Sequence, residues 1–532
     1  MSPDRYSALA LPQPQSPEEE RELLRAFLSG LEKLFRRQDN WTFLRPLLIT
    51  VEHCVRCQTC SEACHIFTAS GRQEIYRPTY RSEILRRLYF KYIQHRRWQG
   101  AVELDWRTVS NLAELAYRCN LCRRCAQVCP MGADNGLVAH ELRKLFSQEM
   151  GIAPKELHAA GSLVQLRTGS TTGMNPAAAR DNFDFIDQEM TEKTGIPIKT
   201  PWDVEGADVL LIHNAGEVLA WPENPGAFAV MLTAAGVSWT LSSDLTAYDA
   251  VNYGLWYDDV QFARVALRQI EAARKLKVKR IVIGECGHAH KALTVIADRL
   301  LPSDLNLPRE SSMTLMRDLV LSGRLPVDPA RNAFPVTLHD PCNLTRLMGL
   351  TEPQRDVLRA VCPDIREMSP NRTDNYCCGG GSGFALMSGK TFRDWRIEIA
   401  GARKMEQVLA AFAGCMARHP QVHLRPVQQL QGAVPGSAGP PRVMEEQPDF
   451  LRRLGRAGSQ RHARRQARFP RMGMALKAAY RGLTTLSQVA AFLRRADRAV
   501  SPRVIAYRFR RLCRTSLFRH GEPRQAFRPR WE

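Results

Sequence analysis

This sequence of 532 residues lacks several features that would assign a simple function. It contains no run of about eighteen apolar residues, so we expect no membrane-spanning helix. The first residues lack the positive start and apolar core of an export signal, which favours a cytoplasmic protein. There is no phosphate-binding loop ending in Lys-Ser/Thr, no catalytic triad and no nucleic-acid motif. These absences argue against nucleotide-dependent, hydrolytic and nucleic-acid-binding classes.

Cysteine is also scarce, because 15 cysteines in a chain of this length are too few for a disulfide scaffold. Eight of them nevertheless fall in two runs of identical spacing, which requires another explanation. The runs are Cys54-x2-Cys57-x2-Cys60-x3-Cys64 and Cys119-x2-Cys122-x2-Cys125-x3-Cys129, the second followed by Pro130. This spacing is typical of two 4Fe-4S clusters, in which the fourth cysteine of each run binds the other cluster. Zinc sites usually use C-x2-C pairs with four ligands in all and explain the runs poorly.

The two runs therefore predict two sets of cluster ligands. We assign Cys54, Cys57, Cys60 and Cys129 to one 4Fe-4S cluster and Cys119, Cys122, Cys125 and Cys64 to the other. The 54 residues between the runs contain helical patterns at 80–98 and 108–117, more than a small ferredoxin needs. The spacing indicates the helical ferredoxin module of multi-subunit oxidoreductases.

A second group of cysteines lies in the C-terminal half. Cys342 stands in the sequence His-Asp-Pro-Cys after an expected strand at 336–339, Cys377 and Cys378 open the run Cys-Cys-Gly-Gly-Gly-Ser-Gly, and Cys415 follows 37 residues later. Glycines beside adjacent cysteines let the backbone approach a cluster and direct N–H groups at its sulfurs. A structural glycine-rich turn with two buried cysteines is the alternative.

These motifs resemble the cysteine-rich CCG domain of heterodisulfide reductase, and with the ferredoxin runs upstream the chain is similar to the D subunit of that enzyme and to DsrK-like proteins. The resemblance implies a third iron-sulfur cluster, held by Cys342, Cys377, Cys378 and Cys415, at which disulfides are cleaved. The final C-x2-C of that family falls on Phe412–Cys415, so one of its cysteines is replaced by Phe412. Five potential ligands become four, which suffice for an ordinary 4Fe-4S cluster.

An older copy of the same unit precedes the CCG motifs. Residues 212–216 mirror 338–342, and Asn252-Tyr253 falls where Cys377-Cys378 stands. The first copy keeps a cysteine, Cys286, where the second has Phe412. We therefore predict catalytic roles for Cys286, Cys377 and Cys378, with Cys286 between the halves as the missing ligand or a redox thiol. A buried structural cysteine is the alternative for Cys286.

Three histidines near these motifs, His288, His290 and His339, could donate protons to a leaving thiolate, because imidazole titrates near neutrality. For any single one of them a structural role is the simpler interpretation.

The expected fold is α+β and multidomain, because helical patterns at the start give way to short apolar strands alternating with helices. A helical two-cluster ferredoxin domain is followed by duplicated α/β CCG-type units and a basic, largely helical tail. The expected parts are a leader and helix (1–50), the ferredoxin domain (51–160), a connector (161–205), a degenerate first CCG-type unit (206–334), a second unit (335–430), a flexible linker (431–470) and the tail (471–532).

The net charge of +21 is concentrated in that tail. From residue 451 onward, 21 Arg and one Lys face only three acidic residues, which accounts for 19 of the net charges. Apolar residues recur among them at helical spacing, which favours docking on a membrane surface or membrane partner over a merely solvated tail. Nucleic acid is the least favoured partner.

Together these features predict an iron-sulfur subunit of a membrane-associated respiratory complex, cytoplasmic and peripheral on the inner face of the membrane. It would take electrons from a membrane cytochrome b or quinone-reactive subunit and reduce a protein or small-molecule disulfide, or oxidise the thiols. Whether the chain itself is an oxidoreductase stays open. The alternatives are an iron-sulfur subunit of a flavin-dependent glycolate, lactate or glycerol-phosphate dehydrogenase, a pure electron relay, and a basic scaffold protein.

Overall fold

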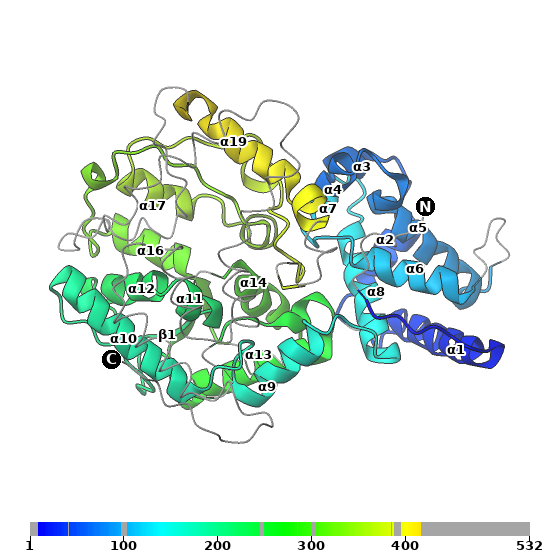
Figure 1. Cartoon of the computed structure of the whole chain (residues 1–532), viewed down its shortest axis with the longest axis horizontal. Helices are drawn as coiled ribbons and strands as arrows, with labels where there is room; N and C mark the ends of the chain where they lie inside the picture. Colours follow the sequence, from blue (N-terminus) through cyan, green and yellow to red (C-terminus); the bar gives the residue numbers. More distant parts are fainter. Residues whose placement is uncertain are drawn as a thin grey trace, which may run out of the picture. The chain divides into compact units, whose positions relative to one another are not determined.

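The computed structural model describes residues 9–40, 42–96, 104–244, 249–284, 286–300, 305, 307–384, 386–387 and 395–416 (Figure 1). The chain divides into two compact units, Met1–Gly439 and Pro440–Glu532. The expected linker at 431–470 and basic tail at 471–532 lie outside the described residues, as do the side chains of Phe412 and Cys415. None of the helices in the described ranges combines the length and apolarity needed to cross a membrane.

The first part of the fold is helical, as predicted. Helix α1 (Pro17–Leu34) starts where Ser16 caps it and Pro17 presets its first turn, and it packs on α8 and α6 (Figure 1). The other elements here are α2 (Leu44–His53), α3 (Thr59–Ala63), α4 (His65–Ala69), η2 (Glu74–Tyr76), α5 (Pro78–Leu88), the π-turn η3 (Tyr89–Ile93), α6 (Trp106–Ala116), α7 (Arg124–Gln127) and α8 (Asn135–Met150). The expected helix at 80–98 is thus α5 continued by η3.

Segment 161–205, expected to be a connector, has substantial structure of its own. It contains α9 (Leu163–Thr168), preceded by the π-turn η4 (His158–Ser162), and the long helix α10 (Pro176–Thr194). Helix α10 packs on α12 and buries Ala179, Phe183 and Ile186 on one face. Those apolar residues are spaced at helical intervals within a polar stretch, which obscures the pattern in the sequence.

The sheet contains four parallel strands in the order β2-β1-β3-β4: β1 (Val209–Ile212), β2 (Trp239–Thr240), β3 (Arg280–Ile283) and β4 (Arg309–Ser311). One of the expected short apolar strands is the fully buried β1, which is paired along its length with β3. The helices of this unit are α11 (Ala215–Ala220), α12 (Glu223–Ala234), η5 (Tyr253–Trp256), α13 (Asp259–Lys275), α14 (Gly287–His290), the π-turn η6 (Lys291–Ile296), α15 (Ala297–Leu300) and α16 (Ser312–Leu321). Since the chain leaves β1 for β2 and returns to β3 on its other side, the carboxyl ends of β1 and β3 form a topological switch point.

The predicted strand at 336–339 is wrong. Only Val336 pairs, in a single parallel bridge with Ile365, because Pro335 and Pro341 bound the run and leave it too short to extend a ladder. The short helix η8 (Pro329–Asn332) precedes this run, and the described elements after it are the π-turn η9 (Asn343–Leu347), α17 (Pro353–Val361), η10 (Arg372–Asp374), the π-turn η11 (Arg396–Ala400) and α19 (Ala402–Met416). The fold is therefore α+β, with its parallel sheet confined to the first α/β unit among the described residues.

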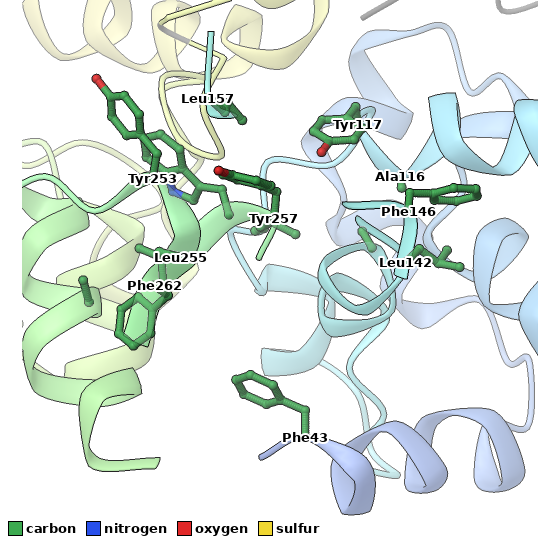
Figure 2. Close-up of a cluster of buried hydrophobic side chains, with 14 of the residues drawn as sticks. Phe43, Ala116, Tyr117, Leu142, Phe146, Leu157, Tyr253, Leu255, Tyr257 and Phe262 are labelled. Carbon is green, nitrogen blue, oxygen red and sulfur yellow. The ribbon is translucent and has the colours of Figure 1, made fainter. Parts of the chain in front are cut away.

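One hydrophobic core joins the helical part to the α/β part. Figure 2 shows a portion of it, with Tyr117, Leu142 and Phe146 on the helical side. Tyr253, Leu255, Tyr257 and Phe262 belong to the same core and come from the α/β part (Figure 2). Burial of such large side chains is worth about 1.5–3 kcal/mol each, so the two parts hold each other firmly. This shared core fixes the distance between the cysteine groups on either side of it.

Candidate iron-sulfur sites

The two cysteine runs adopt the same backbone conformation. In each run the residue before the second cysteine and the residue after it have positive φ: Arg56 (58°) and Gln58 (67°) in the first, Leu121 (52°) and Arg123 (59°) in the second. A short helix then begins in each run, α3 or α7. Left-handed backbone is uncommon for residues other than glycine, and its repetition at equivalent positions indicates a functional loop.

The first set of predicted ligands is gathered around one cavity. Cys54, Cys57, Cys60 and Cys129 all line it, so the structure brings the last cysteine of the second run to the first run. The backbone N–H of Ala133 donates to Cys129 Sγ at 3.3 Å, and Asn135 Nδ2 lies 3.9 Å from Cys60 Sγ. Burial and the neighbouring thiols raise the pKa of Cys60 to about 11.

The second set is gathered in the same crossed manner. The thiols of Cys119, Cys122 and Cys64 are electrostatic neighbours of Cys125, whose pKa is raised well above its usual value, mainly by burial. Burial raises the pKa of Cys64 to about 12, and Cys122 and Cys119 contribute. Metal binding to such thiols must displace their protons.

The donor sets fit 4Fe-4S clusters better than single ions. Among the described residues no three His, Cys, Asp or Glu side chains converge closely enough to hold one metal ion. Zinc would require its thiolates about 4 Å apart, given Zn–S bonds of about 2.3 Å. A cluster spreads four thiolates over four irons, so its ligands need not converge on a single point. The ligand assignment itself stays a prediction.

The CCG cysteines also come together. The Cys377 thiol is hydrogen-bonded to those of Cys342 and Cys378, and Cys378 also contacts His339. Cys377 is buried and Cys378 is exposed. Cys415 is in α19, but its side chain lies outside the described part of the chain. Three of the four predicted ligands are thus neighbours, and His339 is the predicted proton donor that touches one of them.

A buried ion pair fixes the loop that carries Cys342. Asp340, 1% exposed, receives both terminal nitrogens of Arg355 at 2.8 Å and the backbone N–H of Arg372 at 2.6 Å. Arg355 also donates to Glu367 at 2.7 and 2.9 Å. The bidentate geometry holds the loop in one orientation and so positions Cys342.

Glycine allows close backbone approach at this site. Gly379 has φ +74°, and a Cβ there would lie 2.7 Å from the backbone nitrogen of Gly401. Gly254, its counterpart in the proposed older copy, approaches the Phe262 backbone nitrogen, where a Cβ would lie at 2.2 Å. Both glycines thus allow a close backbone approach, although each approaches a different segment and Asn252 and Tyr253 replace the cysteines of the second copy.

Two buried lysines, Lys291 and Lys404, and the half-buried Arg346 surround the CCG cysteines, and sequence reasoning missed all three. Lys291 interacts electrostatically with Cys342, Lys404 with Cys378 and Cys377, and Arg346 with Cys342 and Cys377. Burial lowers the pKa of Lys291 and of Lys404 to about 8. The nearby carboxylate of Asp340 is already paired with Arg355. Such a cationic surround fits an anionic thiolate-bound cluster.

Cys286 lies at the end of the sheet that faces the second CCG-type unit (335–430). It caps α14 directly after the carboxyl end of β3, at the topological switch point, and is 6% exposed. Helix α14 packs against η9, and Gly287 lies near Pro341 and Leu344. The predicted position between the halves is therefore observed, while its role as ligand or redox thiol stays a prediction.

His288 and His290 do not have the properties predicted for proton donors. Burial lowers the pKa of both to about 4, so both are neutral near pH 7. His290 is held by the Cys286 carbonyl at 2.9 Å and by Ser311 Oγ at 2.8 Å, which is a structural role. Their proximity to the cysteines in sequence did not reveal this burial.

The second ferredoxin loop lies against the CCG site. Buried Arg143, on α8, donates to the carbonyls of Cys119 at 2.7 Å and Trp256 at 3.2 Å, and also to Ser382 in the glycine run. Arg346 donates to the carbonyl of Cys122 at 2.7 Å. In the sequence, only the position of Arg346, one helical turn after Cys342, could have indicated that it lies near the CCG site. Nothing in the sequence singled out Arg143.

Comparison with known proteins agrees with this arrangement. Residues 50–133 match the 4Fe-4S dicluster domain, and residues 336–419 match the cysteine-rich CCG domain. No solved structure matches the chain. The chain is therefore an iron-sulfur protein that joins a dicluster ferredoxin domain to a CCG domain, and electron transfer is the activity these domains support.

Individual proteins similar to this chain include subunits of a menaquinol oxidoreductase and of a heterodisulfide reductase. It is 27% identical over 384 residues to an Hdr-like menaquinol oxidoreductase iron-sulfur subunit 2 of Archaeoglobus fulgidus, covering 64% of this chain and 68% of the relative. It is 24% identical over 344 residues to the D subunit of the dihydromethanophenazine:CoB–CoM heterodisulfide reductase of Methanosarcina mazei, covering 63% and 79%. A "Probable membrane-anchored ferredoxin" of Chromohalobacter salexigens is 28% identical over 330 residues, covering 61% and 46%. The predicted resemblance to the D subunit of heterodisulfide reductase is confirmed.

Proposed function

We propose that this chain is the electron-transferring subunit of a membrane-associated respiratory complex that reduces a disulfide or oxidises the corresponding thiols. The observation that carries the proposal is the contact of the second ferredoxin loop, through Arg346 and Arg143, with the segments on either side of Cys377 and Cys378. The names of the relatives, a menaquinol oxidoreductase and a heterodisulfide reductase, support a quinone-reactive or cytochrome b partner and a disulfide substrate.

The residues around the proposed sites have separable tasks. Bound clusters would supply one-electron chemistry, whereas reduction of a disulfide to two thiols takes two electrons and two protons. His339, in contact with Cys378, is placed to donate a proton to a substrate thiolate that leaves at this site. The buried cations offset the negative charge that thiolates accumulate there.

The first cysteine set is placed for electron exchange with a partner. Cys57 is exposed, and the cavity is rimmed by Val55 and Met131, which are 62% and 48% exposed. Exposed apolar side chains beside a redox site suit a docking surface for a protein that carries electrons. The direction of electron flow between this surface and the CCG site stays open.

A pure electron relay is the second candidate, because Phe412 replaces a family cysteine. A flavoprotein-dehydrogenase subunit is the third. The relay predicts two clusters only, whereas the flavoprotein alternative predicts copurification with a flavin-containing partner.

Iron analysis tests the proposal directly. We expect about twelve irons per anaerobically purified chain, matched by acid-labile sulfide, since three clusters contain four irons each. Electron paramagnetic resonance of protein oxidised with a substrate thiol should then show a signal absent from the reduced protein. About eight irons and only reduced ferredoxin signals would instead identify the relay.

Cys286 provides a second test. If it is a ligand or redox thiol, we expect Cys286→Ser to change the signal of the thiol-oxidised protein and to lower disulfide turnover at least tenfold, with the ferredoxin signals preserved. Cys362→Ser, which alters another buried cysteine away from the motifs, is the control and should behave like the wild type. An unchanged signal and turnover in Cys286→Ser would leave Cys286 a structural residue.

A further inference from the structure

Arg346 lies between the second ferredoxin loop and the CCG cysteines. It is on η9, which begins directly after Cys342. Its Nε donates to the carbonyl of Cys122 at 2.7 Å, and Nη1 donates to the carbonyls of Thr373 at 2.8 Å and Asn375 at 3.0 Å. Its Nη2 is buried and has no hydrogen-bond partner among the described residues. One side chain thus connects a predicted ligand of each site.

The charge of this guanidinium is balanced by no carboxylate in the part of the chain that the structure describes. Its three acceptors are backbone carbonyls, which carry only partial charge. Arg346 is half-buried, and its Nη2 is buried without a partner, so a negative group beside this end of the guanidinium would stabilise it. The groups at hand are the thiols of both sites: Cys122 and Cys125 on one side, Cys342 and Cys377 on the other. They become anionic only when they bind metal.

We propose that Arg346 is a positioning residue whose single charge serves as the shared counter-ion of the second ferredoxin cluster and the CCG cluster. The part of this inference that concerns the CCG cluster rests on the proposed function. The positive charge stabilises the more negative, reduced state of each cluster and so raises both reduction potentials. No bond forms or breaks; only the free energy of adding one electron changes. The contact with Cys122 also holds the two loops together.

The experiment is an anaerobic redox titration of the whole chain, followed by electron paramagnetic resonance. We expect Arg346→Gln to raise the oxidised-to-reduced ratio of two clusters at least tenfold at a fixed applied potential, which is about 59 mV for one electron. The cluster on Cys54, Cys57, Cys60 and Cys129 should change less than threefold. Arg346→Lys keeps the charge, so its ratios should stay within threefold of the wild type.

A matched control removes the same charge from the same unit. Arg359 is on the exposed side of α17 and pairs with Asp356 at 2.9 Å, so Arg359→Gln should leave all ratios within threefold of the wild type. The inference is overturned if Arg346→Gln shifts no cluster or shifts all equally, or if Arg346→Lys shifts them as far as Arg346→Gln.

Two further outcomes remain decisive. If Arg346→Gln loses iron, the Arg346→Lys variant decides. Retained iron with unshifted potentials in Arg346→Lys supports the shared counter-ion. A tenfold change in the oxidised-to-reduced ratios of Arg346→Lys overturns it. If the wild type holds about eight irons, the proposed CCG cluster fails. The ratio of the second ferredoxin cluster then still tests Arg346, so the two failures are distinguishable.

Discussion

Replacement of Arg355 by Met is expected to destabilise the C-terminal half of the described chain by about 3–5 kcal/mol, because it leaves Asp340 charged and buried without its partner. Asp340 and Arg355 are each 1% exposed and are joined by two hydrogen bonds of 2.8 Å. The backbone N–H of Arg372 alone cannot replace a full positive charge. Anaerobic urea unfolding should show the midpoint lowered by about 1 M or more.

The same helix supplies the control for this prediction. Arg359→Met removes a 55% exposed Arg from α17, whose ion pair is worth about 1 kcal/mol or less. Adding Asp340→Asn to Arg355→Met should recover part of the lost stability, since the buried charge disappears with its partner. If Arg355→Met unfolds at the same urea concentration as Arg359→Met, the pair does not hold the loop of Cys342.

Paired cysteine substitutions are expected to reveal the crossed ligation of the ferredoxin clusters. Cys129→Ala should cost about four irons per chain, and adding Cys57→Ala should cost no more, because both residues face the same cavity. Adding Cys64→Ala to Cys129→Ala should instead cost about eight irons, since Cys64 belongs to the other set. Iron and acid-labile sulfide analysis of anaerobically purified protein measures these losses.

Cys362→Ala is the matched control and should retain full iron, because Cys362 is buried among Leu338, Leu358 and Val361, away from both sets. The crossed arrangement is contradicted if the Cys57 and Cys129 substitutions together remove about eight irons. It is equally contradicted if the Cys64 and Cys129 substitutions together remove only about four.

Much of the fold followed from local patterns. Helix α1 lies in the expected leader and helix segment, and β1 and β3 are short apolar strands that alternate with helices, as expected. The strand predicted at 336–339 was wrong because four residues of strand composition form a strand only beside another strand. Here only Ile365 pairs with the run, in a single bridge. Helix α10 was missed because its buried face is narrow and surrounded by charged residues.

The sequence by itself determined the chemistry that the protein supports. Its two cysteine runs, with two or three residues between successive cysteines, have the spacing of cluster-binding loops, and a CCG motif follows them. Spacing of this kind depends on a few backbone torsions, so it can be read locally. Only the tertiary structure decided which ferredoxin loop meets the CCG site and which cations surround it. Arg346 and Cys122 are 224 residues apart, and Arg143 and Ser382 are 239 apart. Such contacts depend on the shared core that joins the helical part to the α/β part, because burial of apolar surface fixes distant segments without leaving a local pattern.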